Sequence, residues 1–228
     1  MPLPDFTFEK KFFKKGFHLI AGADEVGRGA WAGPVVTAAV VLAPAKKLDF
    51  FEELIHQNQI MINDSKKMKF RQRRQTALWL KQNSLGWGIG ESQVSLINRL
   101  GLAKAIHIAF RQSLARLNLY LRSSLSSASQ VDFLLADAFS IPRLKTLSRC
   151  HQHPLIKGDT LSLSIAAASI IAKDYRDSLM IRLAKAQTVY SWGKNKGYGT
   201  HSHQQAILQF SQTRHHRTRF VSTWLSRL

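Results

Sequence analysis

Apolar runs alternate with helical stretches along the chain, and this alternation predicts an α/β fold. Short, mostly apolar runs bounded by turn residues predict strands over 19–23, 35–42, 85–90 and 131–137. Helices are predicted over 66–82, 92–120 and 161–186, and the ambiguous pattern over 43–62 is interpreted as a helical connection. Because strands alternate with long helices and the first two strands are joined by a tight turn, we expect a mixed sheet with an antiparallel element.

Polar and small residues predict how several of these elements begin and end. The sequence Asn63–Asp64–Ser65–Lys66–Lys67 predicts a turn in which Ser65 caps the N-terminus of a basic helix. The stretch 139–157 is predicted to be irregular. Alanines at 166–168 in the last long helix leave room for this helix to lie close to the sheet.

The charge balance indicates a polyanionic partner. The chain has 228 residues, of which 45% are hydrophobic, enough for one large domain or one domain with a small appendage. It carries 33 Lys and Arg against 14 Asp and Glu, a net charge of +19, which favours nucleic acid or an acidic membrane surface. No acidic residue follows Ser178. We therefore divide the chain into a domain over 1–190 and a basic, mostly helical segment over 191–228.

Cysteine usage and the N-terminus bear on the compartment. The single cysteine, Cys150, excludes an intrachain disulfide, which fits a reducing environment. The first residues lack the apolar core of a signal peptide, and no apolar run is long enough to span a bilayer. We expect a cytoplasmic protein, a monomer, with no membrane partner.

The stretch 18–42 has the most unusual charge pattern. Asp24 and Glu25 are adjacent where the first apolar run ends, and a glycine-rich turn with Arg28 follows. Neighbouring strand residues point to opposite faces, so the two carboxylates share one centre only if the backbone bends there, which the glycines permit. Carboxylates are natural ligands of Mg²⁺ and Mn²⁺, and an exposed arginine suits a phosphate. The plainer alternative is a β-hairpin with a charged turn.

Two further carboxylates stand at predicted element ends. Asp137 ends the fourth predicted strand, and Asp159 precedes the helix at 161–186. Converging carboxylates are costly because of desolvation and mutual repulsion, and a divalent cation relieves both costs. Such a cation can also activate water for phosphodiester cleavage while basic residues hold the phosphate backbone. Taken alone, Asp159 also reads as a helix N-cap and Asp137 as a strand-end turn residue.

These residues lie within a longer pattern that resembles the signature of bacterial ribonuclease HII. The stretch 22–36, Gly-Ala-Asp-Glu-Val-Gly-Arg-Gly-Ala-Trp-Ala-Gly-Pro-Val-Val, carries the resemblance, and later blocks follow in the family's order. These blocks are Asn63–Lys67, the strand ending at Asp137, Lys157–Asp159, Ile165–Lys173 with Arg176–Asp177, Lys196–Tyr198, and His216–Arg217 ahead of Phe220. The resemblance covers roughly residues 15 to 222.

The resemblance implies an RNase H-like mixed sheet flanked by helices, with a small helical C-terminal extension. It implies endonucleolytic hydrolysis of the RNA strand of RNA/DNA hybrids and cutting at single ribonucleotides in duplex DNA, with Mn²⁺ or Mg²⁺ as cofactor, in replication and ribonucleotide-excision repair. The family's catalytic, metal-binding carboxylates carry over to Asp24, Glu25, Asp137 and Asp159. The element that senses the 2′-OH carries over to Gly27, Arg28 and Gly29, and the tyrosine that stacks on the next sugar to Tyr198.

Some positions depart from the family pattern or stay open. Ala138 stands where the family usually has glycine, Trp31 is larger than usual in the turn, and Asp174 adds a charge in the last long helix. Lys66 either contacts a backbone phosphate or is simply a solvent-exposed residue at the start of a helix. The related ribonuclease HIII has an extra N-terminal domain and a glutamate as fourth ligand, whereas here the lead-in is short and the fourth candidate is Asp159.

Other functions weigh less. A nuclease or strand-transfer enzyme on the same fold that acts on DNA junctions is disfavoured by the ordered blocks. A basic binding protein without catalysis is disfavoured by the carboxylates, which repel phosphate unless a metal intervenes. Zinc binding is disfavoured because four histidines lack a cysteine pair and specific spacing: His201, His203, His215 and His216.

Overall fold

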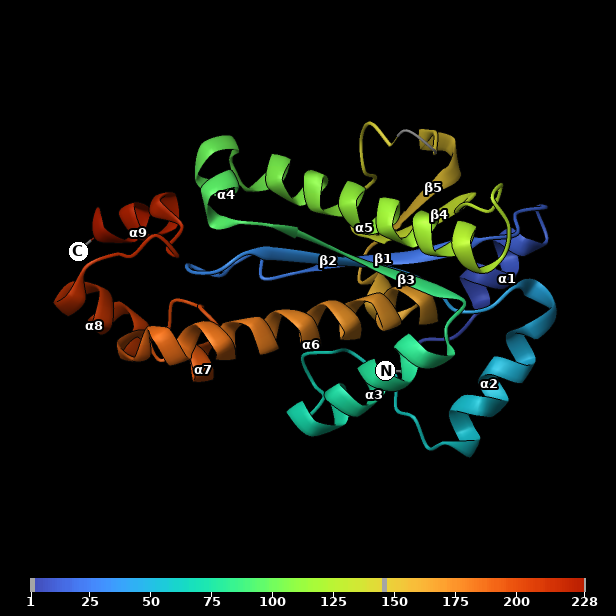
Figure 1. Cartoon of the computed structure of the whole chain (residues 1–228), viewed down its shortest axis with the longest axis horizontal. Coiled ribbons are helices and arrows are strands. Elements are labelled where there is room, and N and C mark those ends of the chain that lie inside the picture. Colours follow the sequence, from blue (N-terminus) through green and yellow to red (C-terminus); the bar gives the residue numbers. More distant parts are fainter. Residues whose placement is uncertain (1–2, 145–146, 228) are drawn as a thin grey trace.

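A five-stranded mixed sheet with helices on both faces forms the centre of the computed structural model, which describes residues 3–144 and 147–227 (Figure 1). The strands, in the order β3-β2-β1-β4-β5, are β1 (Ile20–Val26), β2 (Val35–Val41), β3 (Gly86–Ser92), β4 (Phe133–Asp137) and β5 (Gln152–Leu155). β1 is antiparallel to β2 and β2 to β3, whereas β4 is parallel to β1 and β5 to β4. The predicted α/β class and antiparallel element are confirmed.

Two long helices cover the sheet. α5 (Leu102–Ser124) lies on one face and α6 (Leu163–Ala186) on the other, and α3 (Phe70–Asn83) packs on α6 (Figure 1). The other helices are α1 (Thr7–Phe13), α2 (Leu48–Gln57), α4 (Val94–Leu100), α7 (Trp192–Asn195), α8 (His201–Phe210) and α9 (Thr218–Leu225). Short 3-10 turns lie at Ala45–Lys47, Arg149–His151, Gly158–Thr160 and Thr188–Tyr190. Among the residues described, no helix combines the length and apolarity that crossing a bilayer requires.

Strand glycines let both helices lie directly on the sheet. A Cβ at Gly22 in β1 would overlap the Ser164 backbone of α6, and one at Gly90 in β3 would overlap the Ala109 carbonyl of α5. The alanines at 166–168 are fully buried. The close approach expected from these alanines is confirmed, and glycine on the strand side provides the remaining room.

Two helix predictions were wrong at their boundaries. The helix expected over 92–120 is two helices, because Gly101 between α4 and α5 has a φ of +81°, which glycine adopts readily. The basic helix begins at Phe70 rather than 66, and Ser65 is not its cap. The buried Ser65 hydroxyl instead lies 2.9 Å from the Ser169 hydroxyl of α6, so the turn before α3 is anchored on another helix.

The stretch expected to be irregular, 139–157, contains strand β5. This strand has only four residues and includes Pro154, which removes the apolar alternation by which strands are recognised. Its position at the edge of the sheet explains the proline, because an edge residue can lack a paired amide.

The start of α6 decides between two interpretations of Asp159. The N-cap of α6 is Ser162, whose side chain accepts a hydrogen bond from the Ile165 amide at 3.3 Å. Asp159 lies earlier, in the 3-10 turn Gly158–Thr160. The alternative interpretation of Asp159 as the helix N-cap is therefore wrong.

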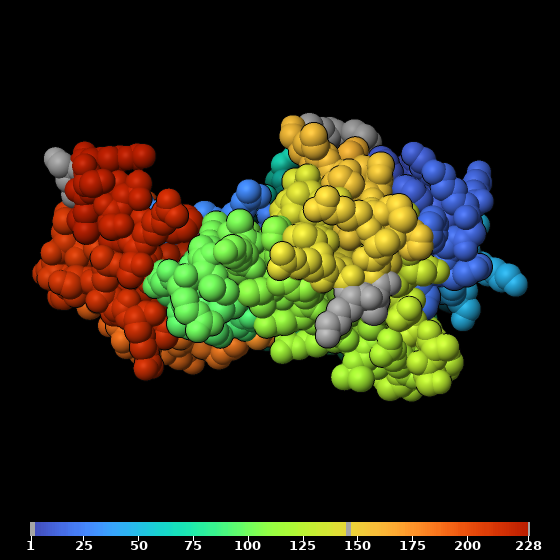
Figure 2. All heavy atoms as spheres, turned by 90° about the horizontal axis from the view of Figure 1, so that it is seen from above, coloured from blue at the N-terminus to red at the C-terminus, as the bar shows by residue number. Residues whose placement is uncertain are grey.

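The C-terminal segment forms one end of the molecule. Figure 2 shows its atoms in red at the end opposite to the blue N-terminal atoms, with a notch in the outline between the red atoms and the yellow segment after β4. Its residues Trp192 and Val221 form a core together with Tyr190 and with Met180 of α6. The small helical C-terminal extension is confirmed, and the division into 1–190 and 191–228 stays a prediction.

Gly22→Ala is expected to lower the free energy of unfolding by roughly 3 kcal/mol, because the backbone of α6 cannot move aside for the added methyl group. Urea denaturation followed by circular dichroism measures the change. Gly193→Ala is the matched control, since its Cβ would lie in ordinary contact at 3.6 Å from Ala184, and it should change stability by less than about 1 kcal/mol. A Gly22→Ala protein as stable as the wild type would contradict the direct contact.

Candidate active site

The ends of β1 and β4 bring two acidic residues together. Ala23 pairs with Ala136, so Asp24 and Asp137 occupy the next positions on neighbouring parallel strands. Asp24 is only 6% exposed and Asp137 is half-buried. As predicted, Asp137 is the last residue of its strand.

A third acidic residue comes from the turn before α6. The Asp137 carboxylate accepts a hydrogen bond from the Gly158 amide at 2.7 Å, which fastens this turn to the end of β4. Asp159 follows in the same turn and is 9% exposed. The connection between β5 and α6 therefore carries Asp159 to the same edge of the sheet.

Glu25 joins this cluster without the backbone bend that the sequence led us to expect. β1 stays paired with β2 through Val26, so Asp24 faces α6 and Glu25 faces the opposite side of the sheet. The Asp24 carboxylate accepts a hydrogen bond from the Glu25 amide at 2.7 Å. The expected bend is wrong: the strand is regular, and the carboxylates lie on both sides of its end.

Burial and mutual repulsion raise the pKa values in this cluster. Burial, followed by the charge of Glu25, raises the pKa of Asp24 well above its usual range. Burial raises the pKa of Glu25 to about 7, although the Arg28 guanidinium 3.6 Å away opposes the shift. Burial and the charge of Asp137 raise the pKa of Asp159. Each of these three carboxyl groups therefore releases its proton at a higher pH than a free carboxyl group does.

The donor atoms of the cluster fit a hard divalent cation. Carboxylate oxygens are the preferred ligands of Mg²⁺ and Mn²⁺, and Glu25 Oε2 is buried without a hydrogen-bond partner. A cation would satisfy this oxygen and reverse the repulsion that raises the pKa values. Within residues 3–144 and 147–227, no three His, Cys, Asp or Glu side chains lie in an arrangement that already holds a metal ion.

The glycine turn meets Tyr198 on the surface beside the cluster. Gly27 has a φ of +89°, and both Arg28 and Gly29 are exposed. Tyr198 borders this turn, since a Cβ added at Gly29 would lie 4.0 Å from Tyr198 Cε1. The structure therefore brings together the residues to which the resemblance assigns 2′-OH sensing and sugar stacking. Those roles stay predictions.

Lys66 borders the carboxylate cluster, whereas Lys173 does not. Lys66 lies close enough to Asp159 to oppose the rise in the pKa of that carboxyl, and its amide donates to the Asp64 carboxylate at 2.9 Å. Lys173 instead forms an ion pair with Asp177 at 2.8 Å. Lys66 therefore borders the cluster, whereas Lys173 is engaged within the fold, and contact of Lys66 with a phosphate stays a prediction.

Two buried arginines beneath the glycine turn had no role assigned from the sequence. Arg176 and Arg217 are both fully buried. The Arg217 side chain donates to the carbonyls of Arg28 at 2.9 Å and Gly33 at 3.0 Å. Arg176 donates to three carbonyls, those of Ala32 at 3.1 Å, Pro34 at 2.9 Å and Lys196 at 2.9 Å. The only sequence signal was their place inside family blocks, because arginine seldom predicts burial.

His203 and His216 form a hydrogen-bonded pair. Trp192 Nε1 donates to His203 Nε2 at 3.1 Å, so that nitrogen is unprotonated and Nδ1 donates to the Tyr198 carbonyl at 2.9 Å. His216 Nε2 donates to the same His203 Nε2 at 3.1 Å, and its Nδ1 accepts from the Thr213 amide at 2.9 Å. Both rings are neutral, since burial lowers the pKa of His203 and lowers that of His216 to about 4. Their in-plane lone pairs are occupied, which argues against zinc here.

The departures from the family pattern have physical consequences. Ala138 has a φ of +64°, a left-handed conformation that explains why glycine is usual there. Trp31 packs against Trp224 with ring centroids 5.1 Å apart, and it leaves no room for a Cβ at Gly199. Asp174 is buried with one carboxylate oxygen unpartnered, and burial raises its pKa.

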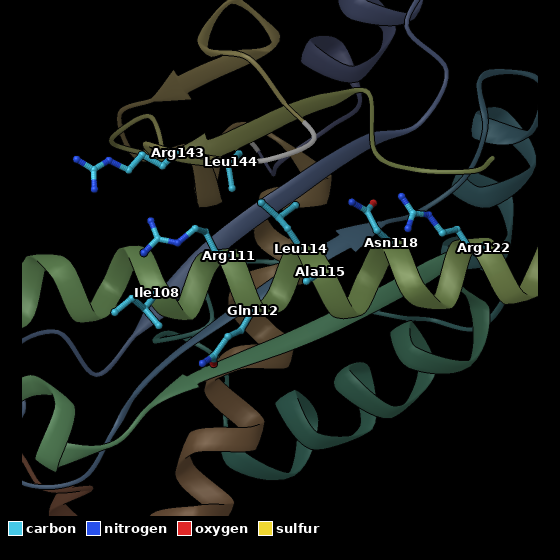
Figure 3. Close-up of a pocket in the computed structure, with 9 residues that line it drawn as sticks. All are labelled: Ile108, Arg111, Gln112, Leu114, Ala115, Asn118, Arg122, Arg143 and Leu144. Carbon is cyan, nitrogen blue, oxygen red and sulfur yellow. The ribbon is translucent and has the colours of Figure 1, made fainter. Parts of the chain in front are cut away.

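A hollow of about 670 Å³ lies along α5 (Figure 3). Its lining includes three apolar residues, Ile108, Leu114 and Leu144, and three arginines, Arg111, Arg122 and Arg143. Figure 3 shows these side chains coming from α5 and from the segment after β4. No carboxylate lines this hollow, so it is separate from the candidate active site.

The comparisons with known proteins agree with one another. The family model described as Ribonuclease HII matches residues 21–223. Ribonuclease HII of Ruegeria pomeroyi is 40% identical over 220 residues, covering 96% of this chain and 83% of the relative. Ribonuclease HII of the Wolbachia strain from Brugia malayi is 38% identical over 224 residues, covering 97% of this chain and 95% of the relative.

Solved structures show the same fold. Ribonuclease H2 from Pyrococcus horikoshii aligns with a TM-score of 0.65 and 21% identity, covering 91% of this chain and 97% of that chain. Bst-RNase HIII in complex with Mn²⁺ aligns with a TM-score of 0.65 and 17% identity, covering 91% and 69% of the two chains. At these identities the likeness concerns the fold alone, and it confirms the RNase H-like architecture.

The metal-free protein is expected to lose stability through Glu25 as the pH rises from about 4.5 to 7. The Glu25 pKa is about 7 in the folded state against an ordinary value of 4.5, so between these values the folded state binds the extra proton and rising pH favours unfolding. Relative to Glu25→Gln, which cannot ionise, the wild type should lose roughly 2–3 kcal/mol across this window. Urea denaturation in EDTA at a series of pH values measures both proteins.

The test compares the free energy of unfolding of the wild type with that of Glu25→Gln at each pH. The lowered pKa of His216 makes both proteins more stable as the pH rises, so this contribution cancels in the comparison. A divalent cation should diminish the difference, since it favours the ionised carboxylate. Parallel pH profiles in EDTA would show that the Glu25 pKa is not raised.

Ala138→Gly is expected to raise the free energy of unfolding by roughly 0.5–1 kcal/mol. Relief of the left-handed strain, about 1–2 kcal/mol, exceeds the entropy cost of glycine. Ala128→Gly, in an exposed turn without a positive φ, is the control and should destabilise slightly. Thermal denaturation distinguishes the two, and equal losses at both positions would refute the strain at Ala138.

Proposed function

Since the chain belongs to the ribonuclease HII family and is therefore a ribonuclease H type endonuclease, we propose that it uses Mg²⁺ or Mn²⁺ to hydrolyse the RNA strand of RNA/DNA hybrids and to cut at single ribonucleotides in duplex DNA. The observation that best supports this proposal is the acidic cluster at one sheet edge of a chain with a net charge of +19. Such a cluster repels phosphate unless a cation intervenes. The activity would serve replication and ribonucleotide-excision repair.

The residues proposed to hold the cation and carry catalysis are Asp24, Glu25, Asp137 and Asp159. When bound, a divalent cation supplies an activated water and stabilises the charge that develops on the scissile phosphate. The Gly158 amide orients one oxygen of Asp137. Glu25, with a pKa of about 7, is protonated in part near neutral pH and would release this proton when a cation binds. The Mn²⁺ complex of Bst-RNase HIII is consistent with this cofactor class.

The exposed turn Gly27–Gly29 is proposed to sense the 2′-OH, the group that distinguishes a ribonucleotide from DNA. Gly29 has no side chain, so the backbone can approach the hydroxyl, and Arg28 is exposed for the neighbouring phosphate. Tyr198, which borders Gly29, is proposed to lie against the next sugar. A correctly seated 2′-OH would then place the scissile phosphate on the carboxylate cluster.

Exposed basic residues are proposed to hold the duplex. Residues 1–190 would form the catalytic domain, and the segment 191–228 would close over the nucleic acid with its excess of positive charge. Lys66, beside Asp159, would contact a backbone phosphate. We propose that the protein acts as a monomer in the cytoplasm.

Asp137→Asn is expected to lower cleavage of a labelled duplex with one ribonucleotide by a factor of about 10³ or more, because the amide is a poor cation ligand. The variant should still bind the duplex, since the basic surface is unchanged. The assay compares Mg²⁺, Mn²⁺ and EDTA, and uses a continuous RNA/DNA hybrid as the second substrate.

Asp49→Asn is the matched control, because the Asp49 side chain is 90% exposed and pairs only with the surface residue Lys10. It should cleave like the wild type. Substantial cleavage by Asp137→Asn in saturating Mg²⁺, or wild-type cleavage that persists in EDTA, would overturn the proposed metal site.

A further inference from the structure

The two arginines beneath the glycine turn are buried without a counter-ion. Within the described parts of the chain, neither Arg176 nor Arg217 takes part in an ion pair, whereas the buried Arg73 pairs with Asp177 at 2.8 Å. Burial lowers the pKa of both guanidinium groups, that of Arg217 to about 9 with a further contribution from the charge of Arg176. One Arg217 terminal nitrogen, Nη2, has no hydrogen-bond partner. Unpaired buried charge destabilises a fold, so packing alone does not account for this pair.

Their hydrogen bonds determine which groups the turn leaves exposed. Four of the five carbonyls that they bind lie in the connection between β1 and β2: that of Arg28 in the Gly27–Gly29 turn, and those of Ala32, Gly33 and Pro34 just after it. Within the described residues, the amides of Arg28 and Gly29 donate to no protein acceptor, and both residues are exposed. The arginines thus bind the carbonyl side of the turn, and two adjacent N–H groups are left for a ligand.

Arg176 also connects this turn to Tyr198. It donates to the Lys196 carbonyl at 2.9 Å, and its guanidinium carbon lies 5.7 Å from the centroid of the Tyr198 ring. A Cβ at Gly27 would overlap the Arg176 side chain, so this glycine is also the residue that admits the arginine. One side chain therefore contacts both elements proposed to read the ribonucleotide.

We propose that Arg176 and Arg217 are positioning residues for ribonucleotide selection, which hold the Gly27–Gly29 turn and Tyr198 in one fixed arrangement. They also give the turn a positive field without occupying its surface. Neither residue touches the substrate in this role. The inference rests on the proposed function, because it concerns how the 2′-OH sensing turn is held.

Arginine is required here because of its shape as well as its charge. The planar guanidinium offers five N–H donors in a fixed fork, so one side chain can bind several carbonyls at set angles. A lysine keeps the charge but presents one compact ammonium, which cannot reproduce the three bonds of Arg176. Arginine-to-lysine substitution therefore separates positioning from charge.

The experiment measures two quantities for Arg176→Lys and Arg217→Lys. The first is kcat/KM for cleavage of a duplex with a single ribonucleotide in Mg²⁺, and the second is the Kd for the same duplex made entirely of DNA. We expect kcat/KM to fall roughly tenfold, as for one or two lost hydrogen bonds, while the Kd changes less than twofold. Arg111→Lys, at a half-buried arginine of α5 that donates to the Pro142 carbonyl at 3.2 Å, is the control and should preserve both quantities.

The outcomes separate positioning from simple loss of structure. Unchanged kcat/KM in both variants would overturn the inference, and so would an equal loss of cleavage and binding, which unfolding produces. Should Arg217→Lys not fold, Arg176→Lys carries the test, with the amide resonances of Arg28 and Gly29 as a second readout that must shift. A wild-type protein that does not cut the single-ribonucleotide duplex would instead refute the proposed function.

Discussion

The arrangement of the molecule depends on the direct backbone contact between α6 and β1 at Gly22, where no side chain fits. Because the helix lies this close to the strand, Ser169 reaches the carboxylate cluster and Arg176, about two turns later, lies beneath the glycine turn. Asp177, the next residue, binds Arg73 of α3. One helix therefore sets the spacing between the carboxylates, the recognition turn and the segment that carries Lys66.

Opposite charges are held close together in the chain without neutralising each other. Buried carboxyl groups gather at the end of β1, and two buried arginines bind only carbonyls, most of them in the connection that follows this strand. Glu25 of the carboxyl cluster and Arg28 of the glycine turn form an ion pair at 3.6 Å. A buried carboxyl cluster next to buried arginines without counter-ions suits a ligand that brings both a cation and a phosphate. Perturbed ionisable groups of this kind are typical of functional sites.

The sequence predicted what depends on local patterns. Apolar runs located β1, β2, β3 and β4, and Asp137 was correctly placed at a strand end. It did not predict β5, because a four-residue edge strand with a proline carries no alternation, nor the break at Gly101, because its effect depends on a positive φ within a continuous apolar stripe. The resemblance proposed the carboxylates, the turn and Tyr198, and their chemical roles stay predictions.

The sequence did not predict contacts between residues that lie far apart along the chain. Ser65 looked like a helix cap, yet it bonds to a serine on another helix, and the burial of Arg217 arises only when the C-terminal segment meets the turn. Such contacts follow from tertiary packing, which overrides local preference. The unbent course of β1 through Glu25 is a further case, since the ladder with β2 decided it.

The bond from Arg217 to the Arg28 carbonyl joins residues 189 positions apart, and that from Arg176 to Pro34 spans 142 positions. The pairing of β1 with β4 and its carboxylates does not need the C-terminal segment. Local opening of the C-terminal segment would therefore release the Gly27–Gly29 turn from Arg217 while the paired strands that carry Asp24 and Asp137 stay intact.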